Sequence, residues 1–142
     1  MPVDPYYFSH VSKKVKINTR ITLAGRAIND SMMDFAYNKI IRELKKYKNK
    51  KILICGLSYK ENVSDIRNSL ALKIFKKLKR NNPNINGYDP IVNTKLSLKN
   101  NFKTIINKFD NFDVYVPITK HKKLQKLIKS LPKNKIIISI FN

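Results

Sequence analysis

Three charged residues that could take part in ligand chemistry, Lys60, Asp65 and Arg67, lie close together within residues 58–69. An apolar run at residues 52–57 precedes them, and its length and composition predict a buried strand. In an open α/β sheet, ligands bind beyond the carboxyl ends of the strands. The loop at residues 58–69 would therefore border a ligand site and offer it two cations and a carboxylate.

The same loop also has a purely structural explanation. It could be a solvated connection that holds a salt bridge and a helix cap at Asn68 or Ser69. The chain contains three glycines, Gly25, Gly56 and Gly87, so the dinucleotide fingerprint G-x-G-x-x-G is absent. The sequence therefore does not predict a stand-alone NAD-binding module of the usual kind.

A second candidate is the segment PVDPYY at residues 2–7, in which two prolines bracket Asp4 and two tyrosines follow. A stiff segment of this kind suits the wall of an active site, and it equally suits an ordered chain terminus. Proline disfavours helix in the residue before it, so we expect residues 1–16 to begin as an extended segment.

The elements that must position these residues change in type at about Asn49. Before it, apolar residues at three- and four-residue spacing predict one long helix over residues 18–47, with a possible local break at Asn29 and Asp30. Such a helix could pack against a partner subunit or lie across its own domain, and the sequence leaves both arrangements open.

After Asn49, predicted strands alternate with predicted helices, which implies a parallel sheet with covering helices. Pro117 argues against residues 114–118 forming a full central strand. The expected strands are residues 52–57, 85–88, 114–118 and 135–140, and the expected helices are 68–80, 102–109 and 120–130.

Composition limits the class of protein. The chain has 142 residues, 42% of them hydrophobic, which suits one ordinary domain or a small domain with an appendage. The formal net charge of +21 would suit a polyanion, but the excess is mostly scattered lysine accompanied by abundant Asn and Ile. Genome composition explains that bias better than a nucleic-acid site, for which charge is the sole argument.

The sequence also bears on cellular location. No apolar run approaches the roughly 20 residues of a membrane span, and the first ten residues do not have the pattern of a signal peptide. The single cysteine, Cys55, cannot form an internal disulfide, which fits a reducing compartment. We therefore expect a cytoplasmic protein that has no membrane partner.

Four segments stand out by their residues, order and spacing: PVDPYY (2–7), AGRAINDSM (24–32), ILICGLSYKENVSDIRNS (52–69) and YDP (88–90). Together they resemble the UDP-glucose/GDP-mannose dehydrogenases, or nucleotide-sugar 6-dehydrogenases. The form PVDPYY is similar to the branch that acts on UDP-N-acetylhexosamines.

This resemblance implies a fold and a division into domains. Residues 1–48 would be part of the central linking and dimerisation helical region. Residues 49–142 would be the C-terminal UDP-sugar-binding domain, a Rossmann-like α/β domain of three layers with a parallel sheet. The implied partners are a UDP-sugar and either a second copy of the chain or a separate N-terminal half.

The resemblance also implies a reaction. The family oxidises the sugar's primary alcohol at carbon six to a carboxylate with two NAD molecules in sequence, through a thioester on a cysteine. By this resemblance Asp4 is a catalytic residue that helps activate water, and Lys60 contacts the sugar nucleotide, with Tyr59 lining the same pocket. Arg67 would reach NAD bound by the other domain, and no metal is implied.

The chain departs from the family pattern at its beginning. The family's cysteine would stand two residues before Pro2, and Met1 occupies the intervening position. The NAD-binding domain is absent too, so we expect the chain alone to have no dehydrogenase activity. The alternatives are a non-catalytic dimerisation or sugar-nucleotide-binding module that complements a separate N-terminal half, and a basic nucleic-acid-binding protein.

Overall fold

The computed structural model describes residues 4–14 and 16–140, and these residues belong to two compact units. One unit comprises residues 1–35 and the other residues 36–142. Helix α2 (Arg20–Leu44) contributes its first part to one unit and its last part to the other. The domain boundary expected near Asn49 stays a prediction.

Helix α1 (Asp4–Lys14) occupies most of the segment that was expected to be extended. That expectation was wrong for the residues described. Pro5 stands in the first turn of the helix, where the missing amide hydrogen has no intrahelical acceptor in any case. Proline therefore favours a helix start here instead of opposing a helix.

The helical unit at residues 1–35 buries small polar side chains. Among its described side chains, those that are buried belong to Ser9, Ser12 and Thr19. Thr19 Oγ1 donates a hydrogen bond of 2.9 Å to Ser9 Oγ, which joins α1 to the start of α2. Large apolar side chains of this unit, among them Phe8, Ile21 and Ile28, are exposed.

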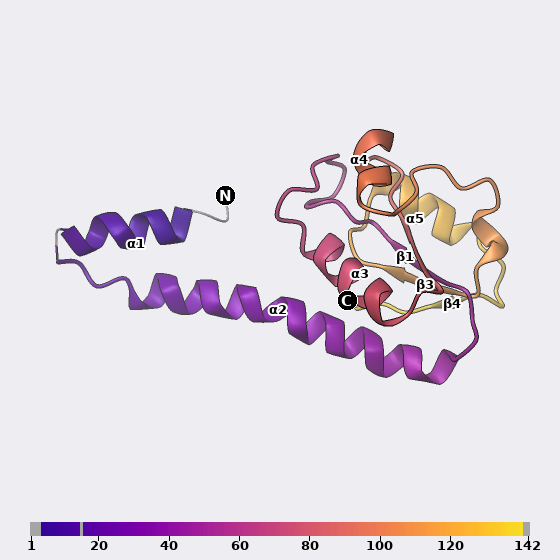
Figure 1. Ribbon diagram of the computed structural model, residues 1–142, viewed down its shortest axis with the longest axis horizontal. Helices are drawn as coiled ribbons and strands as arrows, with labels where there is room; N and C mark the ends of the chain where they lie inside the picture. Colours follow the sequence, from indigo (N-terminus) through magenta and orange to yellow (C-terminus); the bar gives the residue numbers. More distant parts are fainter. Residues whose placement is uncertain (1–3, 15, 141–142) are drawn as a thin grey trace. The chain divides into compact units, whose positions relative to one another are not determined.

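Helix α2 runs without interruption through Asn29 and Asp30, so the break expected there was wrong (Figure 1). Arg26 forms an ion pair with Asp30 one turn further along, a spacing that supports a helix. A short 3₁₀ turn, η1 (Lys45–Tyr47), ends the helical stretch. The helix predicted over residues 18–47 is therefore confirmed in its main part.

The second unit is built on a four-stranded parallel sheet with the order β2-β1-β3-β4, as the alternation of strands and helices predicted. Ile52 pairs with Ile85 on one side and with Val114 on the other, so the first residues of the three longer strands are in register. The strands are β1 (Ile52–Cys55), β2 (Ile85–Tyr88), β3 (Val114–Pro117) and β4 (Ile136–Ile137).

Strand β3 lies between two neighbours although it contains Pro117. The expectation that this proline argues against a central strand was wrong. Pro117 is the last residue of the strand, where its lack of a donor is tolerated. The ladder continues through the next amide, because Ile118 N donates to Cys55 O over 2.8 Å.

Helices cover both faces of the sheet. Helix α3 (Leu70–Asn81) brings Phe75 against Gly87, where an added Cβ would meet the phenyl ring at 2.7 Å. On the opposite face, a core of Leu53, Tyr115 and other residues packs against Leu124 of helix α5 (Lys122–Lys129). The unit is therefore a three-layer α/β domain, as predicted (Figure 1).

The helix predicted over residues 102–109 does not form. Lys103 instead extends the sheet beside β2, since its amide donates to Gly87 O and its carbonyl accepts from Asp89 N. Ile106 and Phe109 then pack on the Tyr115 side of the sheet from an irregular loop. Helix α4 (Thr94–Lys99) and the 3₁₀ turn η2 (Phe109–Asn111) flank this loop.

No helix in the described ranges is both long enough and apolar enough to span a membrane.

Candidate functional site

The loops that follow β1 and β3 touch each other at Gly56. Its φ of +72° lies in the left-handed region, which favours glycine. A Cβ added to Gly56 would lie 2.0 Å from Thr119 O, so no other residue fits there. Gly56 N donates to Tyr88 O over 2.9 Å and Thr119 N donates to Gly56 O over 3.2 Å, which brings three strand ends together.

Asp89, at the end of β2, holds the neighbouring loops through its carboxylate. Its Oδ2 accepts hydrogen bonds from Leu57 N at 2.7 Å and from Ser58 N at 3.0 Å. Its Oδ1 accepts from Ile91 N at 2.9 Å and from Val92 N at 3.3 Å. The carboxylate thereby fixes both the turn that follows β1 and the turn that follows β2.

His121, just before α5, adds the loop after β3 to this network. Its Nε2 lies 3.0 Å from Asp89 Oδ2 and 3.0 Å from Ser58 Oγ. Its Nδ1 accepts a hydrogen bond of 2.9 Å from the backbone amide of Asn62. Because that amide can only donate, Nδ1 carries no proton and Nε2 is the protonated nitrogen of the neutral ring.

The charge state of Asp89 follows from its contacts. Burial raises the pKa of a carboxyl group, but the hydrogen bond from His121 and those from backbone amides outweigh it. The pKa of Asp89 therefore lies below its usual value, and the buried group is an ionised carboxylate at neutral pH.

Ser58, His121 and Asp89 are the residue types of a catalytic triad, but their geometry excludes that role. In a triad, one ring nitrogen faces the serine and the other faces the carboxylate. Here Nε2 faces both Ser58 and Asp89. Ser58 Oγ is also buried and donates to Lys60 O over 3.0 Å. The cluster therefore holds backbone in place.

Tyr59 and Lys60, the predicted substrate-binding residues, lie on the turn that this cluster holds. Both are exposed, and Tyr59 keeps 51% of its surface accessible. The backbone of the turn is fixed by Tyr59 N, which donates to Asp65 O over 2.7 Å. The two side chains therefore project from a well-anchored turn at the carboxyl ends of the strands.

Arg67, the predicted NAD contact, forms an ion pair with Asp65. Arg67 Nη2 lies 2.7 Å from Asp65 Oδ2, and Arg67 Nε contacts both carboxylate oxygens. The hydrogen bonds from Arg67 lower the pKa of Asp65 to about 2, and the pair raises the pKa of Arg67. The Arg67 side chain remains 85% exposed.

The structural explanation of the loop is also realised in part. Ser69 caps α3, since its Oγ accepts from Leu72 N at 3.1 Å and donates to Leu57 O at 2.7 Å. The salt bridge is that of Asp65 and Arg67. These contacts fix the loop without using the Lys60 ammonium, which remains available to a ligand.

Asp4 and Cys55 are the two other residues whose side chains could have a chemical role. Asp4 begins α1, and the placement of its side chain lies outside what the structure describes. Cys55 is fully buried in β1, and burial raises the pKa of its thiol, which makes it an inert core residue as expected.

The Asp89–His121 pair is a part of the site that sequence reasoning missed. Asp89 appears in the sequence only as part of the segment YDP (88–90), and His121 lies within the predicted helix 120–130 with no role assigned to it. The signal was present in their positions, because each follows a predicted strand in a sheet whose carboxyl ends converge. In the described part of the chain, no group of three or more His, Cys, Asp or Glu residues could hold a metal ion.

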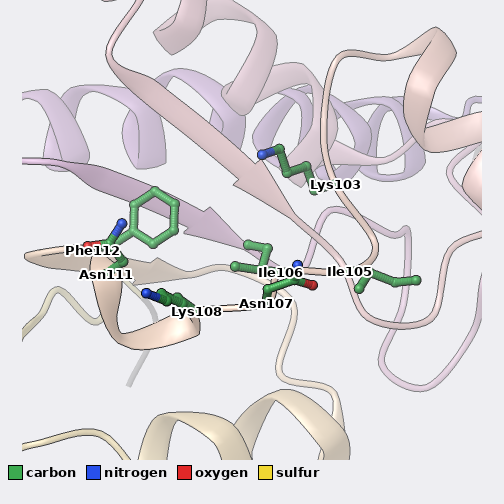
Figure 2. A pocket seen from close by; sticks show the side chains of 7 residues that line it. All are labelled: Lys103, Ile105, Ile106, Asn107, Lys108, Asn111 and Phe112. Carbon is green, nitrogen blue, oxygen red and sulfur yellow. The ribbon is translucent and has the colours of Figure 1, made fainter.

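A hollow of about 350 Å³ lies along the loop between β2 and β3 (Figure 2). It combines apolar side chains with amide and ammonium groups and does not include Tyr59 or Lys60. Its lining residues are Lys103, Ile105, Ile106, Asn107, Lys108, Asn111 and Phe112.

The strand order and the covering helices define a doubly wound α/β domain, a class in which ligands bind beyond the carboxyl edge of the sheet. Residues 53–142 match the family model described as UDP-glucose/GDP-mannose dehydrogenase family, UDP binding domain. The chain belongs to this family.

Curated relatives agree with this assignment. The chain is 31% identical over 97 residues to the UDP-N-acetyl-D-glucosamine 6-dehydrogenase of Pseudomonas aeruginosa, a match that covers 66% of this chain and 23% of that protein. It is 29% identical over 150 residues to the UDP-N-acetyl-D-mannosamine dehydrogenase of Methanococcus vannielii, covering 99% of this chain and 33% of the relative. The chain thus spans about a quarter to a third of the length of these relatives.

Solved structures show the same fold. The UDP-D-ManNAc dehydrogenase of Pyrococcus horikoshii is 29% identical, with a TM-score of 0.64 over 99% of this chain and 34% of that one. The GDP-mannose dehydrogenase of Pseudomonas aeruginosa has a TM-score of 0.75 over 99% of this chain and 35% of that one. Its identity is only 14%, so this second likeness concerns the fold alone.

Proposed function

We propose that this chain is the sugar-nucleotide-binding part of an NAD-dependent dehydrogenase that oxidises a UDP-N-acetylhexosamine to its uronic acid, a polysaccharide precursor. The observation that carries the proposal is the exposed Tyr59–Lys60 turn at the carboxyl edge of the sheet, in a chain that belongs to a family of UDP-binding domains. The names of its relatives support the N-acetylhexosamine as the sugar.

Lys60 is the residue we assign to the ligand. Its exposed ammonium can hold the diphosphate of a UDP-sugar, and in the complete enzyme it can also offset negative charge that develops on the sugar. Tyr59, next to it, can offer its ring to the uridine or the sugar. Asp4 is assigned to the orientation of a water molecule, by the family resemblance of PVDPYY.

NAD enters the proposal as the cofactor of the family. The residues of this chain do not fit it well, because the loop after β1 contains Gly56 as its single glycine and no phosphate-binding fingerprint. The guanidinium of Arg67, the residue assigned to NAD, is held by Asp65. We therefore derive no NAD-dependent step from this chain, and we expect the 142-residue chain to bind a UDP-sugar without oxidising it.

A second role, as a dimerisation module, is favoured by a specific observation. Ile21, Ile28 and Phe35 of α2 are exposed at a spacing of seven residues, so they form one apolar stripe along the helix. An exposed stripe of this kind suits a helix from a second copy of the chain or from a separate N-terminal half. We assign such a protein to the cytoplasm.

Calorimetry with the purified chain tests the binding role. We expect UDP and UDP-N-acetylglucosamine to bind, and Lys60→Met to weaken both by about tenfold, the loss typical of one charge-assisted hydrogen bond. Lys133→Met is the matched control, because Lys133 is exposed in the loop before β4, away from the carboxyl ends of the strands. Equal affinities in all three proteins would refute the role of Lys60.

A further inference from the structure

We infer that His121 is the positioning residue of the turn that presents Tyr59 and Lys60, an inference that rests on the proposed binding of a UDP-sugar at that turn. His121 is completely buried and cannot touch the ligand. Its influence on binding would pass through the backbone that it holds.

The imidazole contacts both ends of the turn. At the first end, Nε2 lies 3.0 Å from Ser58 Oγ, which in turn donates to Lys60 O over 3.0 Å. At the other end, Nδ1 accepts from Asn62 N at 2.9 Å. Lys60 lies midway between these two contacts, so the ring sets the path of the backbone on both sides of it.

The far end of the turn is held through both its backbone and its side chain. Asn62 has a φ of +59°, a left-handed conformation that asparagine adopts more readily than most other residues with a side chain. Its side-chain Oδ1 accepts from Lys122 N at 3.0 Å, in the first turn of α5. His121 and the start of α5 therefore both hydrogen-bond to Asn62 and keep it in this conformation.

The two ring nitrogens make different contributions. Nε2 supplies a donor to the buried carboxylate of Asp89, and the stability of the domain depends on that carboxylate being satisfied. At Ser58, Nε2 is one contact among several, because Ser58 N also donates to Asp89 Oδ2 and Ser58 Oγ also donates to Lys60 O. Nδ1 accepts the hydrogen bond from Asn62 N and makes no contact with Asp89. Stability and turn geometry should therefore respond differently to the loss of each nitrogen.

Two substitutions separate the nitrogens. In His121→Gln, the side-chain amide nitrogen can take the place of Nε2 and keep the donor to Asp89, but the acceptor for Asn62 N is lost. In His121→Asn, the side-chain oxygen can take the place of Nδ1 and keep that acceptor, but the donor to Asp89 is lost. Each variant is the control for the other.

The experiment measures three quantities on the full 142-residue chain: melting temperature, amide hydrogen exchange at Asn62 by NMR, and affinity for UDP by calorimetry. We expect H121N to melt at the lower temperature but to keep protection at Asn62 and near wild-type affinity for UDP. We expect H121Q to be the more stable variant, with exchange at Asn62 and the Kd for UDP each raised about tenfold.

Two results would overturn the inference. One is that Asn62 keeps its protection in H121Q, and the other is that UDP affinity follows melting temperature in both variants, as a purely structural role would require. If the wild-type chain itself does not bind UDP, the proposed binding function fails and the claim that His121 positions a ligand-binding turn falls with it. Hydrogen exchange at Asn62 would still show whether His121 holds the turn.

Discussion

Asp89 and His121, 32 residues apart in the sequence, are both fully buried, and Asp89 Oδ2 lies 3.0 Å from His121 Nε2. The contact joins the end of β2 to the start of α5. Together with four backbone amides, His121 gives the carboxylate of Asp89 five donors. A buried charge with this many partners is well compensated, whereas the loss of one partner is costly.

Replacing Asp89 by Asn should destabilise the domain by about 3 kcal/mol. The substitution keeps the shape of the side chain but places an amide donor opposite donors from either Leu57 and Ser58 or Ile91 and Val92. Urea unfolding followed by circular dichroism measures the change. Asp110→Asn is the control, because Asp110 is exposed in η2 and its loss should change the free energy of unfolding by less than about 0.5 kcal/mol. Equal midpoints for the two variants would contradict the prediction.

The stabilising effect of Asp89 should depend on pH in a defined direction. Its pKa is lower in the folded state than the usual value of about 3.9, so the folded state favours the ionised carboxylate. This contribution is fully present above the unfolded pKa and is lost as the pH falls through the lower folded pKa. The difference in unfolding free energy between wild type and D89N should shrink as the pH falls below about 4. A difference that grows in acid would show that another group is responsible.

Two glycine substitutions should have opposite effects. Gly56→Ala puts a Cβ 2.0 Å from Thr119 O at a φ of +72°, so the chain should lose several kcal/mol of stability or fail to fold. Gly25→Ala lies within helix α2 with nothing within 4 Å of the new Cβ. Alanine there should stabilise the helix by about 0.5–1 kcal/mol. Thermal unfolding of both variants measures this, and a neutral Gly56→Ala would show that the two loops can separate without cost.

The apolar stripe of α2 predicts association of the chain. The double variant Ile21→Glu/Ile28→Glu should shift the chain from dimer towards monomer, because it places charge in the middle of the proposed helix contact. Sedimentation velocity at several concentrations measures the mass. A matched single control is Asn38→Glu, on an exposed position of the same helix outside the stripe. A wild-type chain that is monomeric at all concentrations would exclude self-association through this stripe.

The sheet could be predicted from the sequence because its strands are short apolar runs between turn residues. Residues 52–55 are buried at every position, as expected for a strand covered on both faces. The fold class and the parallel arrangement followed from the alternation of these runs with helical periodicity. Secondary structure alone did not fix which strands were central, and Pro117 misled because its effect depends on its place within the strand.

Two segments could not be predicted because long-range contacts decide their structure. Residues 102–109 have apolar spacing compatible with a helix, but Lys103 pairs with β2 and the apolar residues serve the core from a loop. At the N-terminus, Pro5 was taken as a sign of extended chain although the first turn of a helix accepts proline. In both cases the local pattern was compatible with two structures.

The candidate site was predictable in its location and less so in its construction. The loop that carries Tyr59 and Lys60 follows β1 as expected, and the roles of Asp4, Lys60 and Arg67 stay predictions. The buried pair that holds the loop was not predicted, because Asp89 and His121 lie far apart in the sequence and meet only when the strands align. The pairing register of the strands is the information that was missing.

Cys55 gives the domain a natural reporter of its own opening. It is the single cysteine of the chain and it is fully buried in β1, one of the two interior strands of the sheet. A thiol reagent can therefore modify the native protein only during moments when the sheet separates or the chain unfolds. The rate at which the reagent labels Cys55 would therefore report how often the wild-type domain opens, and a bound nucleotide should lower that rate.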